Sequence, residues 1–113
     1  MTETLFNKIN NKDIPADIVY EDKRSIVIKD INPQAPIHLL IIPKKTITML
    51  SLASEDDREI LGHLMLVAGK VSKMLELDDT FNIVINNGAN AGQTIFHLHL
   101  HLLSGKSLNL IPA

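Results

Sequence analysis

The sequence feature that most constrains the fold is the alternation of residues 96–103, Phe-His-Leu-His-Leu-His-Leu-Leu. Three of the chain's five histidines lie in this stretch, at every second position. A β-strand points alternate side chains to opposite faces, so Phe96 and the leucines are predicted to face a core. His97, His99 and His101 would then share the other face, whereas a helix would spread them around its axis. The stretch is therefore predicted to be a strand with one reactive face.

The length and composition of the chain predict one globular domain. Its 113 residues, 45% of them hydrophobic, are enough to bury a core without cross-links, and we place the single domain at residues 4–113. The chain contains no cysteine. A disulfide framework, a thiolate metal site and a cysteine nucleophile are therefore excluded.

Charge and hydropathy restrict the partners that we expect. The formal net charge is −2 and the 11 Lys and Arg residues are dispersed, so no broad surface for nucleic acid is predicted. The first residues lack a basic segment followed by an apolar run, and no apolar stretch approaches the ~20 residues of a membrane span. We therefore expect a cytoplasmic protein with no nucleic-acid or membrane partner.

Hydrophobic periodicity predicts an α+β fold. Thr4 can cap a short N-terminal helix, and a longer helix is predicted from Ser54 to about Glu76. The run 37–42 is apolar except for His38, which is typical of a central strand buried on both faces. Further strands are predicted at residues 17–21, 25–29, 81–86 and 96–103. The expected architecture is an antiparallel sheet of about five strands with one long and one short helix.

The long helix carries more apolar surface than one core stripe requires. The stripe recurs at helical spacing and comprises Ile60, Leu61, Leu64, Val67, Ala68, Val71, Met74 and Leu75. Met65 and Leu66 fall partly outside it and widen the apolar arc. A fully buried helix would explain this surplus, and so would a helix that contacts a second copy of the chain.

A metal site is one interpretation of the histidine stretch. In a strand His97 and His101 would lie about 13 Å apart. Zn–N bonds are only about 2 Å long, so this spacing argues against one ion shared by all three histidines. A site of two histidines, completed by His38 or an aspartate, stays open. A polar sheet face whose histidines are satisfied by their neighbours is the purely structural alternative.

Nucleophilic catalysis is the interpretation that we favour. A neutral imidazole is a nucleophile and, once protonated, an acid near neutral pH. The loop of residues 88–94 precedes the histidines and could bring N–H and hydroxyl donors to a phosphate, although such a loop can also be only a turn. Asp30 could accept hydrogen bonds from both hydroxyls of a ribose, or could simply stabilise a turn.

Several segments together resemble the histidine triad (HIT) superfamily, in particular its histidine triad nucleotide-binding (Hint) branch. The segment 97–103 is similar to the superfamily's signature of three alternating histidines. Residues 30–38, with the run Ile-Ile-Pro-Lys-Lys at 41–45, resemble the Hint branch. So do Phe6-Asn7-Lys8-Ile9, Ile14-Pro15-Ala16, the helix around Gly62-His63 and Gly92-Gln93-Thr94-Ile95-Phe96. The similarity covers about residues 4–105.

This resemblance implies a homodimer with a HIT-like fold that hydrolyses adenosine phosphoramidates such as AMP-lysine. His99 would attack the α-phosphorus and carry the nucleotide covalently until water releases the monophosphate. His101 would hydrogen-bond the phosphate or the leaving group. His97 would orient the nucleophile, largely through its backbone carbonyl, and His38 matches the family's upstream supporting histidine.

The resemblance also implies the residues that bind the purine nucleotide. Asp30 matches the ribose-binding acid. Positions near the α-phosphate are matched by Asn86, Gly92, Gln93 and Thr94, and the base pocket would be walled by Phe6, Ile9, Ile28, Ile31 and Leu40. No cofactor is required by this chemistry. A dinucleoside polyphosphate hydrolase and a regulatory nucleotide-binding protein with incidental hydrolysis remain alternatives.

The chain departs from the family pattern at two places. Thr46 stands where many relatives have a further histidine after the lysine pair. The tail of residues 107–113 lacks the tryptophan that several relatives carry near the C-terminus. Because the C-terminal segment shapes the leaving-group side in the family, these departures bear on substrate preference more than on the nucleotidyl chemistry.

Overall fold

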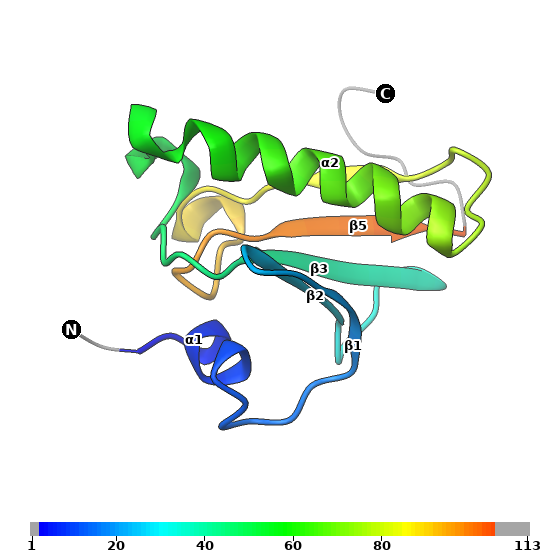
Figure 1. The fold of residues 1–113 in the computed structure, drawn as a ribbon, viewed down its shortest axis with the longest axis horizontal. Coiled ribbons are helices and arrows are strands. Elements are labelled where there is room, and N and C mark those ends of the chain that lie inside the picture. The colour runs from blue at the N-terminus through cyan, green and yellow to red at the C-terminus, as the bar shows by residue number, and fades with distance from the viewer. Residues whose placement is uncertain (1–2, 106–113) are drawn as a thin grey trace.

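The computed structural model describes residues 3–105, which form one antiparallel sheet between two helices of different length (Figure 1). Its elements are α1 (Leu5–Asn10), β1 (Ile18–Glu21), β2 (Ser25–Lys29), β3 (Ile37–Pro43), α2 (Arg58–Met74), β4 (Asn82–Val84) and β5 (Leu100–Ser104), with 3-10 turns at Leu50–Leu52, Glu55–Asp57 and Ala89–Ala91. The strand order is β1-β2-β3-β5-β4. The expected α+β class, five-stranded sheet and two helices are confirmed.

The sheet separates two hydrophobic cores. On one face α2 packs on Val27 of β2 and on Leu39 and Ile41 of β3. On the other face Phe6 and Ile9 of α1 pack on residues of opposite parity, namely Ile26, Ile28, Leu40 and Ile42. Every residue of β3 except its first is buried, so the prediction of a central strand covered on both faces is confirmed.

The register of β5 directs one triad histidine to the face covered by α1. Leu40 of β3 pairs with His101, and Ile41 pairs with Leu100. Leu98, Leu100 and Leu102 are buried in the core beneath α2, as the alternation predicts. His101 therefore points to the side of Leu40, where the smaller core leaves room for a ligand.

The predicted strand of residues 96–103 is too long at its N-terminal end. β5 begins only at Leu100, so His97 and His99 precede it, and Phe96 is 42% exposed instead of facing a core. The physical reason lies in β3, which ends at Pro43 and so has no N–H to offer there. The Pro43 carbonyl instead accepts a hydrogen bond from the His97 ring, 2.8 Å from Nε2.

The long helix confirms the middle of the predicted core stripe but not its end. Leu64, Val67, Ala68 and Val71 are buried. Met74 and Leu75 are exposed, because the helix ends at Met74 and Leu75 serves as its C-cap. Met65 and Leu66 are exposed as well, and Leu66 reaches 76%.

Two expectations extend beyond what the structure describes. The predicted domain of residues 4–113 includes a tail, 106–113, that lies outside the described residues, and so does its departure from the family pattern. Within residues 3–105, no helix combines the length and the apolar character needed to cross a bilayer.

Candidate active site

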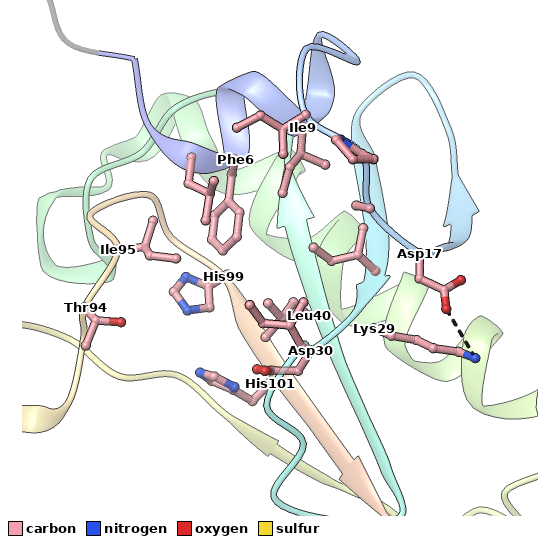
Figure 2. Close-up of a pocket in the computed structure, with 16 residues that line it drawn as sticks. Phe6, Ile9, Asp17, Lys29, Asp30, Leu40, Thr94, Ile95, His99 and His101 are labelled. Carbon is pink, nitrogen blue, oxygen red and sulfur yellow. Dashed lines mark ion pairs between the residues drawn. The ribbon is translucent and has the colours of Figure 1, made fainter.

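A pocket of about 520 Å³ lies between α1 and the sheet (Figure 2). Its walls include nine of the residues singled out from the sequence: Phe6, Ile9, Ile28, Asp30, Ile31, Leu40, Thr94, His99 and His101. Figure 2 shows Phe6 and Ile9 on one side of this pocket and Asp30 and His101 on the other. The pocket thus joins an apolar half to a half that carries a carboxylate and two imidazoles.

His99 has one nitrogen fixed and one available. Its Nδ1 lies 2.8 Å from the backbone carbonyl of His97, which can only accept, so Nδ1 carries the proton. Nε2 then keeps its lone pair, and the edge of Phe6 packs against the ring with centroids 5.0 Å apart. Burial lowers the pKa of His99 below the ordinary value of histidine. At neutral pH the ring is therefore uncharged and nucleophilic.

His97 does not line the pocket and cannot reach a ligand through its side chain. The residue is fully buried, and its Nε2–H donates to the carbonyl of Pro43. Its Nδ1 lies 2.7 Å from the hydroxyl of Thr4. Burial lowers the pKa of His97 as well. Since both ring nitrogens are used inside the protein, His97 contributes to the pocket through its carbonyl on His99.

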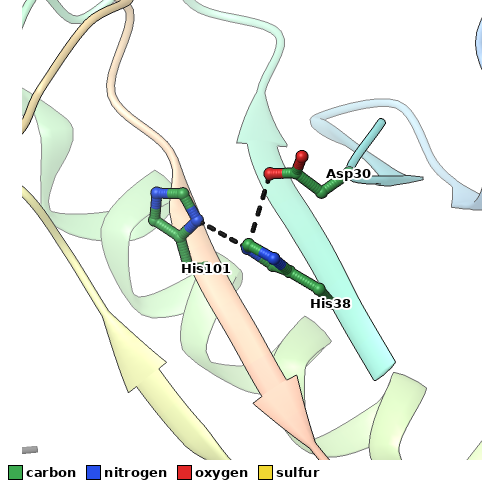
Figure 3. A group of neighbouring side chains, drawn as sticks. All are labelled: Asp30, His38 and His101. Atoms are coloured by element: carbon green, nitrogen blue, oxygen red, sulfur yellow. Dashed lines mark hydrogen bonds and ion pairs between the residues drawn. The ribbon is translucent and has the colours of Figure 1, made fainter. Parts of the chain in front are cut away.

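His38, His101 and Asp30 form a second hydrogen-bonded group (Figure 3). The backbone N–H of Gln34 donates to Nδ1 of His38 at 3.0 Å, so the neutral ring carries its proton on Nε2. That proton points to Nδ1 of His101 at 2.9 Å, with a carboxylate oxygen of Asp30 at 3.4 Å from the same nitrogen. His101 accepts at Nδ1 and therefore presents an Nε2–H donor.

The Gly/Asn-rich loop is held mainly by its own hydrogen bonds. The Gln93 side chain is buried, donates to the carbonyls of Thr48 and Ile95, and accepts from the N–H of Gly88. Asn86 donates to the carbonyl of Ala91. The amides of residues 91–93 donate to carbonyls within the loop, so they do not converge on a ligand as the sequence suggested. Of the four residues predicted near a phosphate, Thr94 lines the pocket, whereas Asn86, Gly92 and Gln93 do not.

Comparison with known proteins identifies the family. A family model of the HIT domain matches residues 11–108. This chain belongs to the HIT family. An uncharacterized HIT-like protein of Synechocystis sp. is 52% identical over 110 residues, which are 97% of this chain and 96% of that protein. A 14 kDa zinc-binding protein of Zea mays is 46% identical over 111 residues, which are 96% of this chain and 87% of the relative.

Solved HIT structures share the fold. The crystal structure of a HIT family hydrolase from Legionella pneumophila matches with a TM-score of 0.93 at 40% identity, covering 98% of this chain and all of that one. A histidine triad nucleotide-binding protein from Candida albicans matches with a TM-score of 0.81 at 31% identity, covering 98% and 84%. The recognition of the superfamily from the sequence is confirmed.

Three residues of this HIT domain fit a metal ion. Asp30, His38 and His101 each offer one ligand atom, and these atoms lie within 4.8 Å of one another. Tetrahedral zinc holds its nitrogen and oxygen ligands about 3.3 Å apart, and two of the three separations, those from Nε2 of His38, are close to this value at 2.9 and 3.4 Å. The ion would need Nε2 of His38, which donates a proton to His101 in this structure. A metal ion and this hydrogen bond therefore exclude each other.

Sequence reasoning missed Gln34 and the second role of Thr4 in this site. Gln34 sets the tautomer of His38 through a backbone N–H, which no side-chain pattern reveals. Thr4 was predicted only as a helix cap, yet its hydroxyl contacts His97 across 93 positions of the chain. A periodic pattern within one element carries no signal for a contact between distant segments.

The buried histidines give the protein a pH dependence that can be measured. Burial, reinforced by the neighbouring His99 and His38, lowers the pKa of His101 to about 4. The unfolded chain then binds more protons than the folded one between about pH 4 and 6.5, so the free energy of unfolding should fall as pH is lowered through this window. Urea denaturation at several pH values measures this slope.

A ring-carbon NMR titration of the same protein separates His101 from the carboxylates. The His101 resonance should stay that of a neutral ring at pH 5 and titrate near 4. His101→Gln should make the slope of stability against pH shallower in this window. An His101 midpoint at or above 6.5 would contradict the structural assignment.

Proposed function

We propose that this protein hydrolyses adenosine 5'-phosphoramidates, such as AMP-lysine, to AMP and the free amine. The observation that carries the proposal is the state of His99, whose Nδ1–H is tied to the His97 carbonyl while Nε2 lies free in a pocket. Two of the matching solved structures, from Legionella pneumophila and Clostridium thermocellum, are described as HIT family hydrolases. The similar protein from Candida albicans is described as nucleotide-binding.

The two halves of the pocket correspond to the parts of a nucleotide. The apolar half, formed by Phe6, Ile9, Ile28 and Leu40, would accept a purine base. Asp30 would accept hydrogen bonds from the ribose hydroxyls. Its Oδ1 already receives the N–H of Asn32 at 2.8 Å, which holds the carboxylate in place. Ile31, fully exposed at the pocket rim, would cover the base from the solvent side.

The α-phosphate would lie in the pocket against the exposed edges of His99 and His101, two rings that are in contact with centroids 5.1 Å apart. Thr94 lines the same part of the pocket and can add a hydroxyl donor. Asn86, Gly92 and Gln93 would act from outside the lining by shaping the loop that carries Thr94. A negatively charged phosphate favours the protonated form of a neighbouring imidazole. Substrate binding would therefore favour protonation of the His101 ring.

The first chemical step forms a nucleotidyl-histidine. Nε2 of His99 attacks the α-phosphorus, the P–N bond breaks, and the leaving nitrogen takes a proton from His101. The His99 ring becomes cationic, and its Nδ1–H remains bonded to the His97 carbonyl, which stabilises the charge. Donors on the phosphate oxygens stabilise the transition state in the same way.

The second step releases the product. Water attacks phosphorus and passes a proton to His101, the bond between phosphorus and Nε2 breaks, and AMP leaves. His99 is then neutral again, and His101 releases the proton to solvent once the negatively charged product has left. His38 would hold the His101 ring through Nδ1 while that ring is neutral, as it does in this structure.

Substitution of His99 tests the proposed nucleophile. His99→Ala should lower turnover of a fluorogenic adenosine phosphoramidate by at least about 10³-fold, because no other neutral imidazole replaces its Nε2. AMP binding, measured by calorimetry, should persist. Mass spectrometry after brief incubation of the wild type with substrate should detect a nucleotidyl adduct on His99. Turnover close to wild type in His99→Ala would rule out this mechanism.

The same assay distinguishes the alternatives. A dinucleoside polyphosphate hydrolase would turn over diadenosine polyphosphates in preference to phosphoramidates when both compete. A regulatory protein would bind AMP with negligible turnover of the whole panel.

We also infer a cytoplasmic location and the absence of nucleic-acid and membrane partners, in keeping with the dispersed charges.

The proposed chemistry requires no metal ion. Protein purified without a histidine tag and treated with a chelator should therefore keep its turnover. If zinc binds at the group of Asp30, His38 and His101, metal analysis and calorimetry should show one ion per chain, and His38→Gln should abolish it. Turnover lost with the chelator and restored by zinc would overturn the metal-free mechanism.

We further propose that the protein is a homodimer through the exposed face of α2. Met65 and Leu66 leave apolar surface on α2 outside the stripe that packs on the sheet, and such surface is typical of a contact with a second copy. Leu66→Lys should convert the dimer to a monomer in light-scattering measurements. Ile18→Lys, at an exposed apolar position on the edge strand β1, should leave the dimer intact. A monomeric wild type would contradict the proposal.

A further inference from the structure

The N-cap of α1 is bonded directly to the histidine triad. The Thr4 hydroxyl accepts the N–H of Asn7 at 3.0 Å, while the Thr4 N–H donates to Oδ1 of Asn7 at 2.8 Å. The same hydroxyl lies 2.7 Å from Nδ1 of His97. One side chain thus begins the helix that walls the pocket and contacts the residue whose carbonyl fixes the nucleophile.

Only one placement of the hydrogens satisfies the contact between the Thr4 hydroxyl and Nδ1 of His97. The Pro43 carbonyl can only accept, so His97 carries its proton on Nε2 and presents a lone pair at Nδ1. The Thr4 hydroxyl must therefore donate to Nδ1. Oδ1 of Asn7 lies farther from that hydroxyl, at 3.0 Å, and already receives the Thr4 N–H. The buried Nδ1 has no other partner among the described residues.

The histidine segment depends on such side-chain contacts because it lies outside the sheet. Residues 94–99 precede β5 and take no part in its pairing with β3. The main-chain bond that ties this segment down is the N–H of Leu98 to the carbonyl of Ile47. The two ring bonds of His97, to Pro43 and Thr4, set the orientation of the peptide whose carbonyl receives Nδ1–H of His99.

Phe6 couples the same helix to both histidines. Its ring packs edge-on against His97 and His99, with centroids 5.6 and 5.0 Å apart. On the far side of the cap, Asn7 donates through Nδ2 to the Thr46 hydroxyl at 2.8 Å. The hydroxyl of Thr46 thus anchors α1 to the segment that follows β3.

We propose that Thr4 is a positioning residue for catalysis, which acts by holding His97 in the tautomer and orientation that align His99. This proposal rests on the proposed hydrolase function. Residues that hydrogen-bond the ligands of metal sites contribute 10- to 100-fold to activity, and small displacements of a reacting group carry penalties of similar size. The Thr4 hydroxyl should therefore influence kcat more than it influences nucleotide affinity.

The test uses three variants of the full chain. Thr4→Val removes the hydroxyl at nearly constant volume and should lower kcat by about 10- to 100-fold, with AMP affinity changed less than about threefold. Thr4→Ser retains the hydroxyl and should recover most of the kcat. Asn7→Ala removes the reciprocal cap and the Thr46 contact but leaves the Thr4 hydroxyl on His97, so its kcat should stay within about threefold of wild type.

A spectroscopic measurement makes the test independent of turnover. Nitrogen NMR of the imidazoles should find His97 of the wild type protonated on Nε2 with a hydrogen-bonded Nδ1. Thr4→Val should shift both that Nδ1 signal and the ring signals of His99, whereas Asn7→Ala should shift neither appreciably. If the wild type has no phosphoramidase activity, the proposed function fails but the NMR comparison still decides whether Thr4 positions His97 and His99.

Two results would overturn the proposal. The first is a kcat for Thr4→Val within twofold of wild type, in protein that is folded by circular dichroism. The second is a wild-type His97 protonated on Nδ1, or a His99 signal that does not respond to Thr4→Val. A loss of kcat in Asn7→Ala as large as that in Thr4→Val would assign the effect to helix capping and would also reject the role of the hydroxyl.

Discussion

The site depends on the hydrogen bond from the His97 ring to the Pro43 carbonyl. Pro43 lacks the N–H that would continue the pairing of β3 with β5, and its carbonyl accepts a hydrogen bond from the His97 side chain instead of from a strand. That bond fixes the tautomer of His97 and, together with the Thr4 hydroxyl, orients the residue whose carbonyl receives Nδ1–H of His99. The available lone pair of the proposed nucleophile is thus determined by a proline at the end of the neighbouring strand.

One face of the sheet carries the main hydrophobic core, and the other face carries the pocket. The side covered by α2 is filled by aliphatic residues and has the larger core. The side covered by α1 is only partly filled, since a helix of six residues cannot cover the central strands, and the remaining space is the pocket. Burial on this side also keeps the imidazoles neutral, so the same packing that leaves the cavity prepares its nucleophile.

The sequence predicts those parts of the structure that follow from local pattern. The burial of β3, the middle of α2 and the inward leucines of β5 could all be inferred from periodicity. The start of β5 could not, because it is set by the end of β3 at Pro43, a residue more than fifty positions away. Similarly, the lining of the pocket was largely anticipated through family resemblance. The internal bonding of Gln93 and the contact of Thr4 with His97 arise only from the folded arrangement.

The pairing register of β5 determines whether a slip of this strand against β3 could give a stable structure. Because His101 lies between Leu100 and Leu102, a slip of one residue against β3 would bury His101 among aliphatic side chains and turn Leu100 and Leu102 into the pocket. Such a slipped form would lose its core together with its site. A misaligned register would therefore be unstable. Burial of the two leucines and placement of the His101 imidazole in the pocket require the same pairing of β5 with β3.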